Sequence, residues 1–170
     1  FTGTAWQGGP NWPDATLGWV NLTAVGGHPG NTRQHACVRR WTAPRKMTVS
    51  LTSKLVHEPA AGDGIRAFVL AARGQQLHAA KAHQQTINLD TASLDVEEGD
   101  VVDFVVDIDN VLNSDQFQWK IAIADVDQQV ADRSHWDSDT DFPGDATMQL
   151  SPWEQLAHVL LCTNEFMFVD

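Results

Sequence analysis

Two segments in the second half of the chain alternate apolar and polar residues with the two-residue period of a β-strand. Apolar residues fill the even positions of VVDFVVDID at 101–109, whereas three of its odd positions hold Asp. In FQWKIAIAD at 117–125, aromatic and Ile residues share the odd positions. Because successive side chains of a strand point to opposite faces, each segment would bury one face and expose the other. This pattern restricts the chain to folds that pack sheets over a core.

Further strand-like runs occur between turn-rich connections at 58–64, 97–100 and 110–115, and no long helical pattern interrupts them. The runs are LGWVNLTAV, HACVRRWT, MTVSLTSKLV, IRAFVLAA and TINLDT. Short strands with regular turn signals predict an antiparallel sandwich. We therefore expect an all-β jelly-roll β-sandwich of the galactose-binding or lectin-like kind over residues 1–130.

The last forty residues have a different character. Residues 131–150 are polar and acidic, without sustained periodicity, and are expected to form a linker. Ser151, Pro152 and Glu154 then provide an N-cap, a first-turn proline and a capping box. An apolar stripe follows at helical spacing: Trp153, Leu156, Ala157, Leu160 and Leu161. We predict a helix over 151–170 that belongs to a neighbouring domain of a longer parent protein.

The charge distribution argues against a nucleic-acid ligand. The net charge is −11, and residues 1–85 carry 9 Lys or Arg against 3 Asp or Glu, while residues 86–170 carry 2 against 19. Phosphate binding needs a concentrated basic surface, which the scattered basic residues do not supply. No apolar run is long enough to span a bilayer. Since the chain starts at Phe1, we expect it to be a processed or excised piece of something longer.

Only Cys37 and Cys162 are present, so a disulfide scaffold and a cysteine-based metal motif are both excluded. Whether these two residues pair is left open by the sequence.

The segment from Gly26 to Pro44 combines planar polar side chains with an aromatic ring, which suits a hydroxylated ligand. Sugars present hydroxyl groups to such side chains and C–H faces to aromatic rings. The candidate ligand residues are Trp6, Trp12, His28, Asn31, Arg33, His35 and Arg40. The alternative is structural: His28 is also an ordinary turn residue, and Trp6 and Trp12 could be buried. Trp19, Trp41 and Trp119 are expected in the core.

Arg39 and Arg40 are adjacent in a predicted strand and must point to opposite faces. If Val38 is buried, Arg40 shares its face and needs a carboxylate partner or a ligand groove. Asp103 and Asp107 are the possible partners, and a structural ion pair is the favoured interpretation.

An acidic cluster lies around the turn between the two alternating strands. Calcium takes six to eight oxygen ligands without strict geometry, and several oxygen-bearing side chains fall within nine residues here. The predicted structural Ca²⁺ ligands are Asp107, Asp109, Asn113 and Asp115. The alternative is that these are solvated turn residues.

A second acidic run, Asp137, Asp139 and Asp141, begins like an EF-hand loop. Phe142 stands where that loop requires Gly, and Met148 stands where it requires Glu, so the motif is rejected.

No enzyme signature is found: the chain lacks a nucleophile elbow, a phosphate loop, a zinc-protease motif and a dinucleotide fingerprint. Glu58, Glu97 and Glu98 could in principle form a glycosidase pair, but Glu97 and Glu98 lie in an ordinary turn before Gly99. We predict a protein that is not an enzyme.

Several segments resemble one family. The ending SPWEQLAHVLLCTNEFMFVD at 151–170 resembles the extreme C-terminus of large planctomycete proteins that join cytochrome-c-type domains to planctomycete-specific domains. GGPNWPDATLGWVNLTAVGGHPGN, HACVRRWTAP and EEGDVVDFVVDIDNVLNSDQFQWKIAI resemble the carbohydrate-binding-module-like β-sandwich near that end. The resemblance implies a periplasmic or otherwise extracytoplasmic setting and polysaccharide binding beside redox domains. The haem-attachment motif C-x-x-C-H is absent, so no haem is expected in this fragment.

The predicted function is non-catalytic binding of a polysaccharide or glycan on behalf of a larger cytochrome-type protein. The alternative is a structural or assembly domain that packs against the redox domains and binds no sugar.

Overall fold

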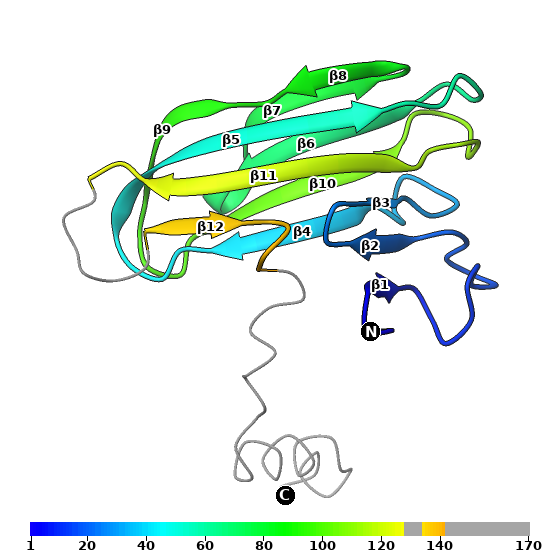
Figure 1. Ribbon diagram of the computed structural model, residues 1–170, viewed down its shortest axis with the longest axis horizontal. Coiled ribbons are helices and arrows are strands. Elements are labelled where there is room, and N and C mark those ends of the chain that lie inside the picture. The colour runs from blue at the N-terminus through cyan, green and yellow to red at the C-terminus, as the bar shows by residue number, and fades with distance from the viewer. Residues whose placement is uncertain (128–133, 142–170) are drawn as a thin grey trace, which may run out of the picture.

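The computed structural model describes residues 1–127 and 134–141 of the chain, and these residues form two antiparallel sheets packed face to face (Figure 1). The larger sheet has the order β1 (Ala5–Gln7), β2 (Asn21–Thr23), β3 (Gly26–His28), β11 (Phe117–Asp125), β5 (Met47–His57) and β8 (Gln85–Asn88), with β12 (His135–Asp137) paired to β11 and β9 (Thr91–Val96) paired to β5. The smaller sheet has the order β4 (Cys37–Thr42), β10 (Val101–Ile108), β6 (Ile65–Ala71) and β7 (Gln75–Ala82). The predicted all-β sandwich is confirmed at this level.

The core lies between the sheets and follows the predicted alternation. The even positions of β10 and the odd positions of β11 from 117 to 123 are all 6% exposed or less. Phe104 and Trp119 join the two layers, with their ring centroids 5.6 Å apart and their planes perpendicular. Each fully buried side chain of this size contributes about 1.5–3 kcal/mol through the hydrophobic effect, so these two strands supply much of the stability of the sandwich.

Five of the predicted runs correspond to single long strands, namely β4, β5, β6, β10 and β11. The run TINLDT covers parts of two strands, β8 and β9, and only part of LGWVNLTAV forms a strand, β2. The sequence did not indicate β1, β3, β7 or β12. In β7 the sequence QQLHAAKA is poor in β-branched and aromatic residues, and its pairing with β6 gives it strand structure.

The predicted linker contains a strand within its described part. β12 pairs antiparallel with β11, with Trp136 opposite Ile123, and Trp136 packs against Trp41 at 5.3 Å between ring centroids. The helix predicted for 151–170 lies outside the described residues. In the described ranges, the one helical element is the 3₁₀ turn η1 (Ala72–Gly74). No helix there has the length and apolarity needed to cross a membrane.

The two adjacent arginines of β4 point to opposite sides of the small sheet. Val38 is 48% exposed, so its face is the outer one. Arg40 lies on that face and forms a bidentate pair with Asp103, with both N–O distances 2.7 Å. The predicted structural ion pair is therefore present, and it lies on the surface.

Arg39 shares the inward face of β4 with Cys37 and Trp41. Its guanidinium donates hydrogen bonds to the backbone carbonyl oxygens of Thr23 (2.7 Å), Ala24 (3.3 Å) and Ser138 (2.9 Å). Burial lowers the pKa of Arg39. This side chain ties the small sheet to the larger one.

Candidate functional site

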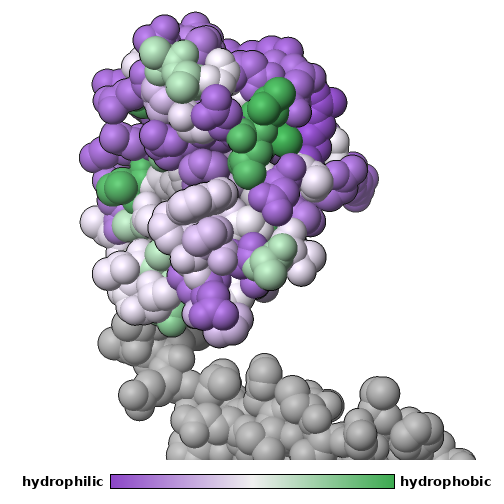
Figure 2. Space-filling view, turned by 90° about the vertical axis from the view of Figure 1, so that its right-hand side faces the viewer, coloured by the Kyte–Doolittle hydropathy of each residue, from purple (hydrophilic) through white to green (hydrophobic). Residues whose placement is uncertain are grey.

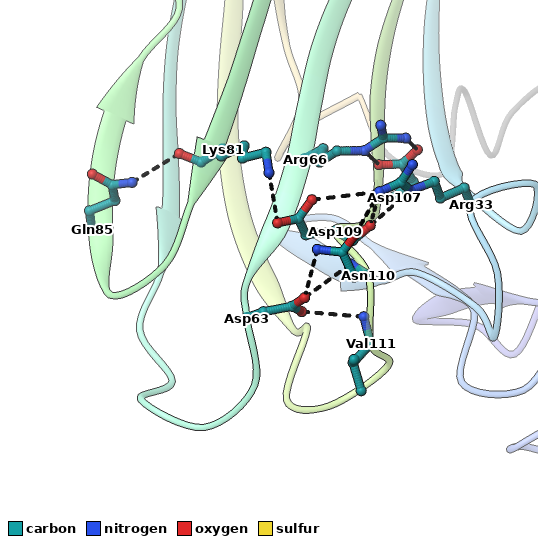
Figure 3. Close-up of polar contacts among 9 residues, drawn as sticks. All are labelled: Arg33, Asp63, Arg66, Lys81, Gln85, Asp107, Asp109, Asn110 and Val111. Carbon is teal, nitrogen blue, oxygen red and sulfur yellow. Dashed lines mark hydrogen bonds and ion pairs between the residues drawn. The ribbon is translucent and has the colours of Figure 1, made fainter.

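Two of the acidic residues predicted to bind calcium, Asp107 and Asp109, are engaged by basic side chains at the end of β10 (Figure 3). Arg66 binds both carboxylate oxygens of Asp107, through Nε at 2.8 Å and through a second short contact. Lys81 Nζ lies 2.8 Å from Asp109 Oδ2, and Arg33 lies 3.7 Å from Asp109 Oδ1. These contacts join β10 to β6, to β7 and to the loop that follows β3.

Asn110 extends this network to the loop before β6. It accepts a hydrogen bond from Arg33 through Oδ1 at 3.1 Å and donates one to Asp63 through Nδ2 at 3.1 Å. Asp63 also accepts from the backbone N–H groups of Asn110 and Val111 (Figure 3). The network holds the β10–β11 loop against its neighbours.

The other two predicted calcium ligands lie in a separate arrangement. Asp115 is fully buried and accepts a hydrogen bond from the backbone N–H of Asn113 at 2.9 Å. Burial raises the pKa of Asp115. Over residues 1–127 and 134–141, no three His, Cys, Asp or Glu side chains form a group that could hold a metal. The four residues are thus not assembled into one ligand shell, and calcium binding stays a prediction.

The long loop between β1 and β2 carries two exposed tryptophans on a tight turn. Asp14 Oδ1 accepts hydrogen bonds from the N–H groups of Thr16 (2.9 Å) and Leu17 (2.8 Å). Gly18 closes the turn with φ +70°, and a Cβ there would lie 1.9 Å from Asn31 Oδ1. The turn therefore requires glycine and holds Trp19 directly after it.

Trp12 and Trp19 form one rigid aromatic pair. Their ring centroids are 4.9 Å apart in an edge-to-face arrangement, and Trp12 Nε1 donates to the carbonyl oxygen of Trp19 at 3.0 Å. Trp12 is 45% exposed and Trp19 is 43% exposed. The expectation that Trp19 is a core residue is wrong, because the turn carries it outside the sandwich.

The opposite wall comes from the loop between β10 and β11. His57, fully buried at the end of β5, lies with Nε2 3.0 Å from the carbonyl oxygen of Ser114. Since a carbonyl oxygen can only accept, Nε2 carries the hydrogen of this imidazole. Burial lowers the pKa of His57, which favours this neutral form. The bond positions the segment 112–116 beside the aromatic pair.

His28, at the end of β3, completes the site. Its ring centroid lies 6.3 Å from that of Trp19, and its Nδ1 is 2.6 Å from the carbonyl oxygen of Pro29. This contact fixes the ring against its own backbone.

Together these three segments enclose a depression of about 430 Å³, which we call the loop-end depression. Figure 2 shows this end of the sandwich, where a strongly hydrophobic patch and an area of near-neutral residues are bordered by hydrophilic ones. The lining residues are Trp12, Trp19, His28, Leu112, Asn113, Ser114 and Gln116. Trp12 and His28 were predicted ligand residues, and Asn113 was predicted for calcium. Ser114 belongs to the oxygen-rich cluster considered for calcium, whereas Leu112 and Gln116 were not singled out by the sequence.

Three other predicted ligand residues do not line the depression. Asn31 hydrogen-bonds the Trp-bearing loop through Nδ2 to Thr16 O at 3.3 Å. Arg33 binds the carbonyl oxygen of Asp109 through Nε at 2.8 Å. His35 has a buried Nδ1 without a hydrogen-bond partner among the described residues. In the structure, Asn31 and Arg33 hold the loops that build the depression.

The remaining two predicted residues, Trp6 and Arg40, line a second cavity of about 630 Å³, the side cleft, between β4 and the β2 and β12 side of the larger sheet. Trp41 and Trp136 form part of its apolar wall. Its charged side chains all make hydrogen bonds within the chain: Arg39, Arg40, Asp137 and Asp141. A ligand in the side cleft would thus contact mainly apolar surface.

Cys37 lies at the inner side of this cleft as a buried thiol that forms no disulfide among the described residues. Its Sγ donates toward the carbonyl oxygens of Asn21 and His28, and burial raises the pKa of Cys37 to about 12. Cys162 lies outside the described residues.

No protein-family model, curated protein or solved structure matches this chain.

Proposed function

We propose that the chain is a non-catalytic carbohydrate-binding module and that the loop-end depression binds the sugar. The observation that carries the proposal is a rigid pair of exposed indoles, Trp12 and Trp19, bordered by neutral polar side chains. Aromatic faces stack on the C–H faces of sugar rings, and amide and imidazole groups hydrogen-bond their hydroxyl groups.

The polar groups of the depression support this choice over the side cleft. Among the described residues, the Gln116 side chain and Asn113 Nδ2 have no hydrogen-bond partner. In the side cleft, by contrast, the charged side chains are already engaged. The unpartnered amide groups of Asn113 and Gln116 are therefore available to the hydroxyl groups of a ligand at the loop end.

The proposal includes the setting that the family resemblance implies. The module would be a jelly roll of the galactose-binding or lectin-like kind that targets a polysaccharide for a larger extracytoplasmic protein with cytochrome-type domains. Calcium, if bound through Asp107, Asp109, Asn113 or Asp115, would have a structural role.

Affinity electrophoresis through gels that contain soluble polysaccharides tests the proposal. The wild-type protein should be retarded by at least one polysaccharide. Trp12→Ala should weaken binding about fivefold, because one aromatic contact is worth about 1 kcal/mol. Retardation that Trp12→Ala and Trp19→Ala both leave unchanged would contradict the assignment to this depression.

Trp6→Ala is the matched control. Trp6 is 50% exposed, close to the exposure of Trp12, but it lines the side cleft. Replacement of Trp6 should leave retardation unchanged. Loss of retardation only in the Trp12 and Trp19 variants would therefore distinguish a local binding site from nonspecific binding by exposed indoles.

The alternative function is an assembly domain that packs against the redox domains of the parent protein. The side cleft favours it, because Trp6, Trp41 and Trp136 give this side an apolar concave surface that a neighbouring domain could cover. Uniformly negative glycan results with folded protein, together with binding of the parent's separately produced neighbouring domain that Trp6→Ala weakens, would favour assembly.

A further inference from the structure

The loop-end depression contains no formally charged side-chain partner for a ligand. Its seven lining residues include no Asp, Glu, Lys or Arg. Three cations at the end of β10, Arg33, Arg66 and Lys81, form ion pairs with Asp107 and Asp109. A carboxylate or sulfate placed in the depression would lose hydration without gaining an ion pair, which is costly.

Asp115 in the β10–β11 loop and the charge of the whole chain bear on the same selectivity. Asp115 lies between Asn113 and Gln116 in sequence but is fully buried and is not one of the lining residues. The whole chain also carries a net charge of −11. The net charge disfavours an anionic sugar, and Asp115 adds no carboxylate to the lining that could bind an ammonium group.

The hydrogen bonds of His28 define which of its ring nitrogens can accept. The carbonyl oxygen of Pro29 can only accept, so Nδ1, 2.6 Å away, must carry a hydrogen. In the neutral imidazole, Nε2 is then an acceptor, and it has no hydrogen-bond partner among the described residues. The lining thus combines one imidazole acceptor with the amide groups of Asn113 and Gln116, which donate and accept.

We propose that the depression selects neutral sugars over uronic acids and sulfated sugars, and that His28 Nε2 accepts a hydrogen bond from a sugar hydroxyl. This proposal rests on the proposed carbohydrate function. The aromatic pair supplies affinity for any pyranose face, whereas the uncharged lining and His28 supply the selectivity.

Matched pairs of soluble polymers test the selectivity with the wild-type protein. Each pair shares a backbone and differs in charge: dextran with dextran sulfate, hydroxyethyl cellulose with carboxymethyl cellulose, and galactan with polygalacturonate. Moderate salt screens the long-range repulsion from the acidic chain. We expect the neutral member of a bound pair to bind at least tenfold more tightly. Equal affinity, or preference for the anionic member, would overturn the selectivity while leaving the carbohydrate function in place.

Three replacements of His28 test its role on the neutral polymer that binds. His28→Gln keeps an acceptor near the position of Nε2, whereas His28→Asn keeps a donor toward Pro29 but loses that acceptor, and His28→Leu loses both. We expect His28→Gln to stay within about twofold of wild type and the other two to bind about fivefold more weakly. Wild-type affinity in folded His28→Asn or His28→Leu would overturn the role of His28. Failure of the wild-type protein to bind any polymer would instead refute the proposed function itself.

Discussion

Replacing Arg39 by Met should destabilise the protein far more than the same change at the adjacent Arg40. Arg39 donates to three backbone carbonyl oxygens, two of them at 2.7 and 2.9 Å and the third at 3.3 Å. Arg40 lies on the outer face and pairs with Asp103 in solvent. Both variants replace Arg by Met, at adjacent positions of one strand. The comparison therefore isolates the effect of whether the side chain points toward the other sheet or toward solvent.

The expected magnitude follows from the two shorter bonds. A hydrogen bond to a charged group is worth about 1.5–3 kcal/mol, and methionine leaves the partly buried carbonyl groups of Thr23 and Ser138 without this donor. Methionine keeps most of the apolar stem, and the desolvation penalty of the guanidinium disappears with the charge. We therefore expect the free energy of unfolding to fall by about 3 kcal/mol, a large part of a typical total of about 5–15 kcal/mol.

Urea unfolding followed by tryptophan fluorescence measures the effect. With a slope of about 2 kcal/mol per M, Arg39→Met should lower the midpoint by about 1.5 M, and the slope itself should not change. Arg40→Met should leave the midpoint nearly where it is, because exposed ion pairs contribute little. Arg39→Lys, which keeps a charge but offers fewer donors, should lie between wild type and Arg39→Met.

Equal midpoints for Arg39→Met and Arg40→Met would refute the reasoning, since the buried contacts of Arg39 would then contribute no more than a surface pair. A changed slope would show that the variant alters the unfolded or native state more broadly.

Three further predictions concern buried and acidic groups. Because burial raises the pKa of Asp115, the fold favours its protonated form, and wild type should gain stability relative to Asp115→Asn as the pH falls from neutral toward about 4. Urea midpoints of both proteins at several pH values measure this change, and a difference in stability that stays constant with pH would contradict it. Since Cys37 is buried and its pKa is about 12, its thiol in a Cys162→Ser variant should resist a thiol reagent until the protein unfolds, and rapid labelling of folded protein would show that the thiol is accessible. If calcium is bound as predicted, a chelator should lower the melting temperature. An unchanged melting temperature would contradict the calcium prediction, and the ion pairs of Asp107 and Asp109 would then be what stabilises the end of β10.

The strands that the sequence predicted well are those in which side-chain alternation reflects burial. β10 and β11 alternate because one side of each faces the core, and burial of one face requires period-two hydrophobicity. β7 escaped prediction because it is an edge strand whose sequence QQLHAAKA lacks β-branched and aromatic residues, and it owes its strand structure to backbone pairing with β6. Pairing of this kind leaves little trace in a single sequence.

The candidate site could be predicted only in part. Trp12 and His28 were identified because aromatic and imidazole groups in Gly- and Pro-rich loops suit ligand binding. Gln116 and Leu112 could not be identified, since the β10–β11 loop meets the β1–β2 loop only after the sheets form. Asp107 and Asp109 looked like calcium ligands because the basic residues that engage them, Arg66 and Lys81, are distant in sequence.

The sequence by itself determined that the chain is an all-β sandwich, because hydrophobic periodicity is a local record of which side of a strand is buried. Only the tertiary structure decided which arginine of β4 faces inward, which tryptophans are exposed, and which loops enclose the depression. These properties depend on contacts between segments far apart in the chain. The composition of one segment, and the spacing of residues within it, do not indicate which other segment it will contact.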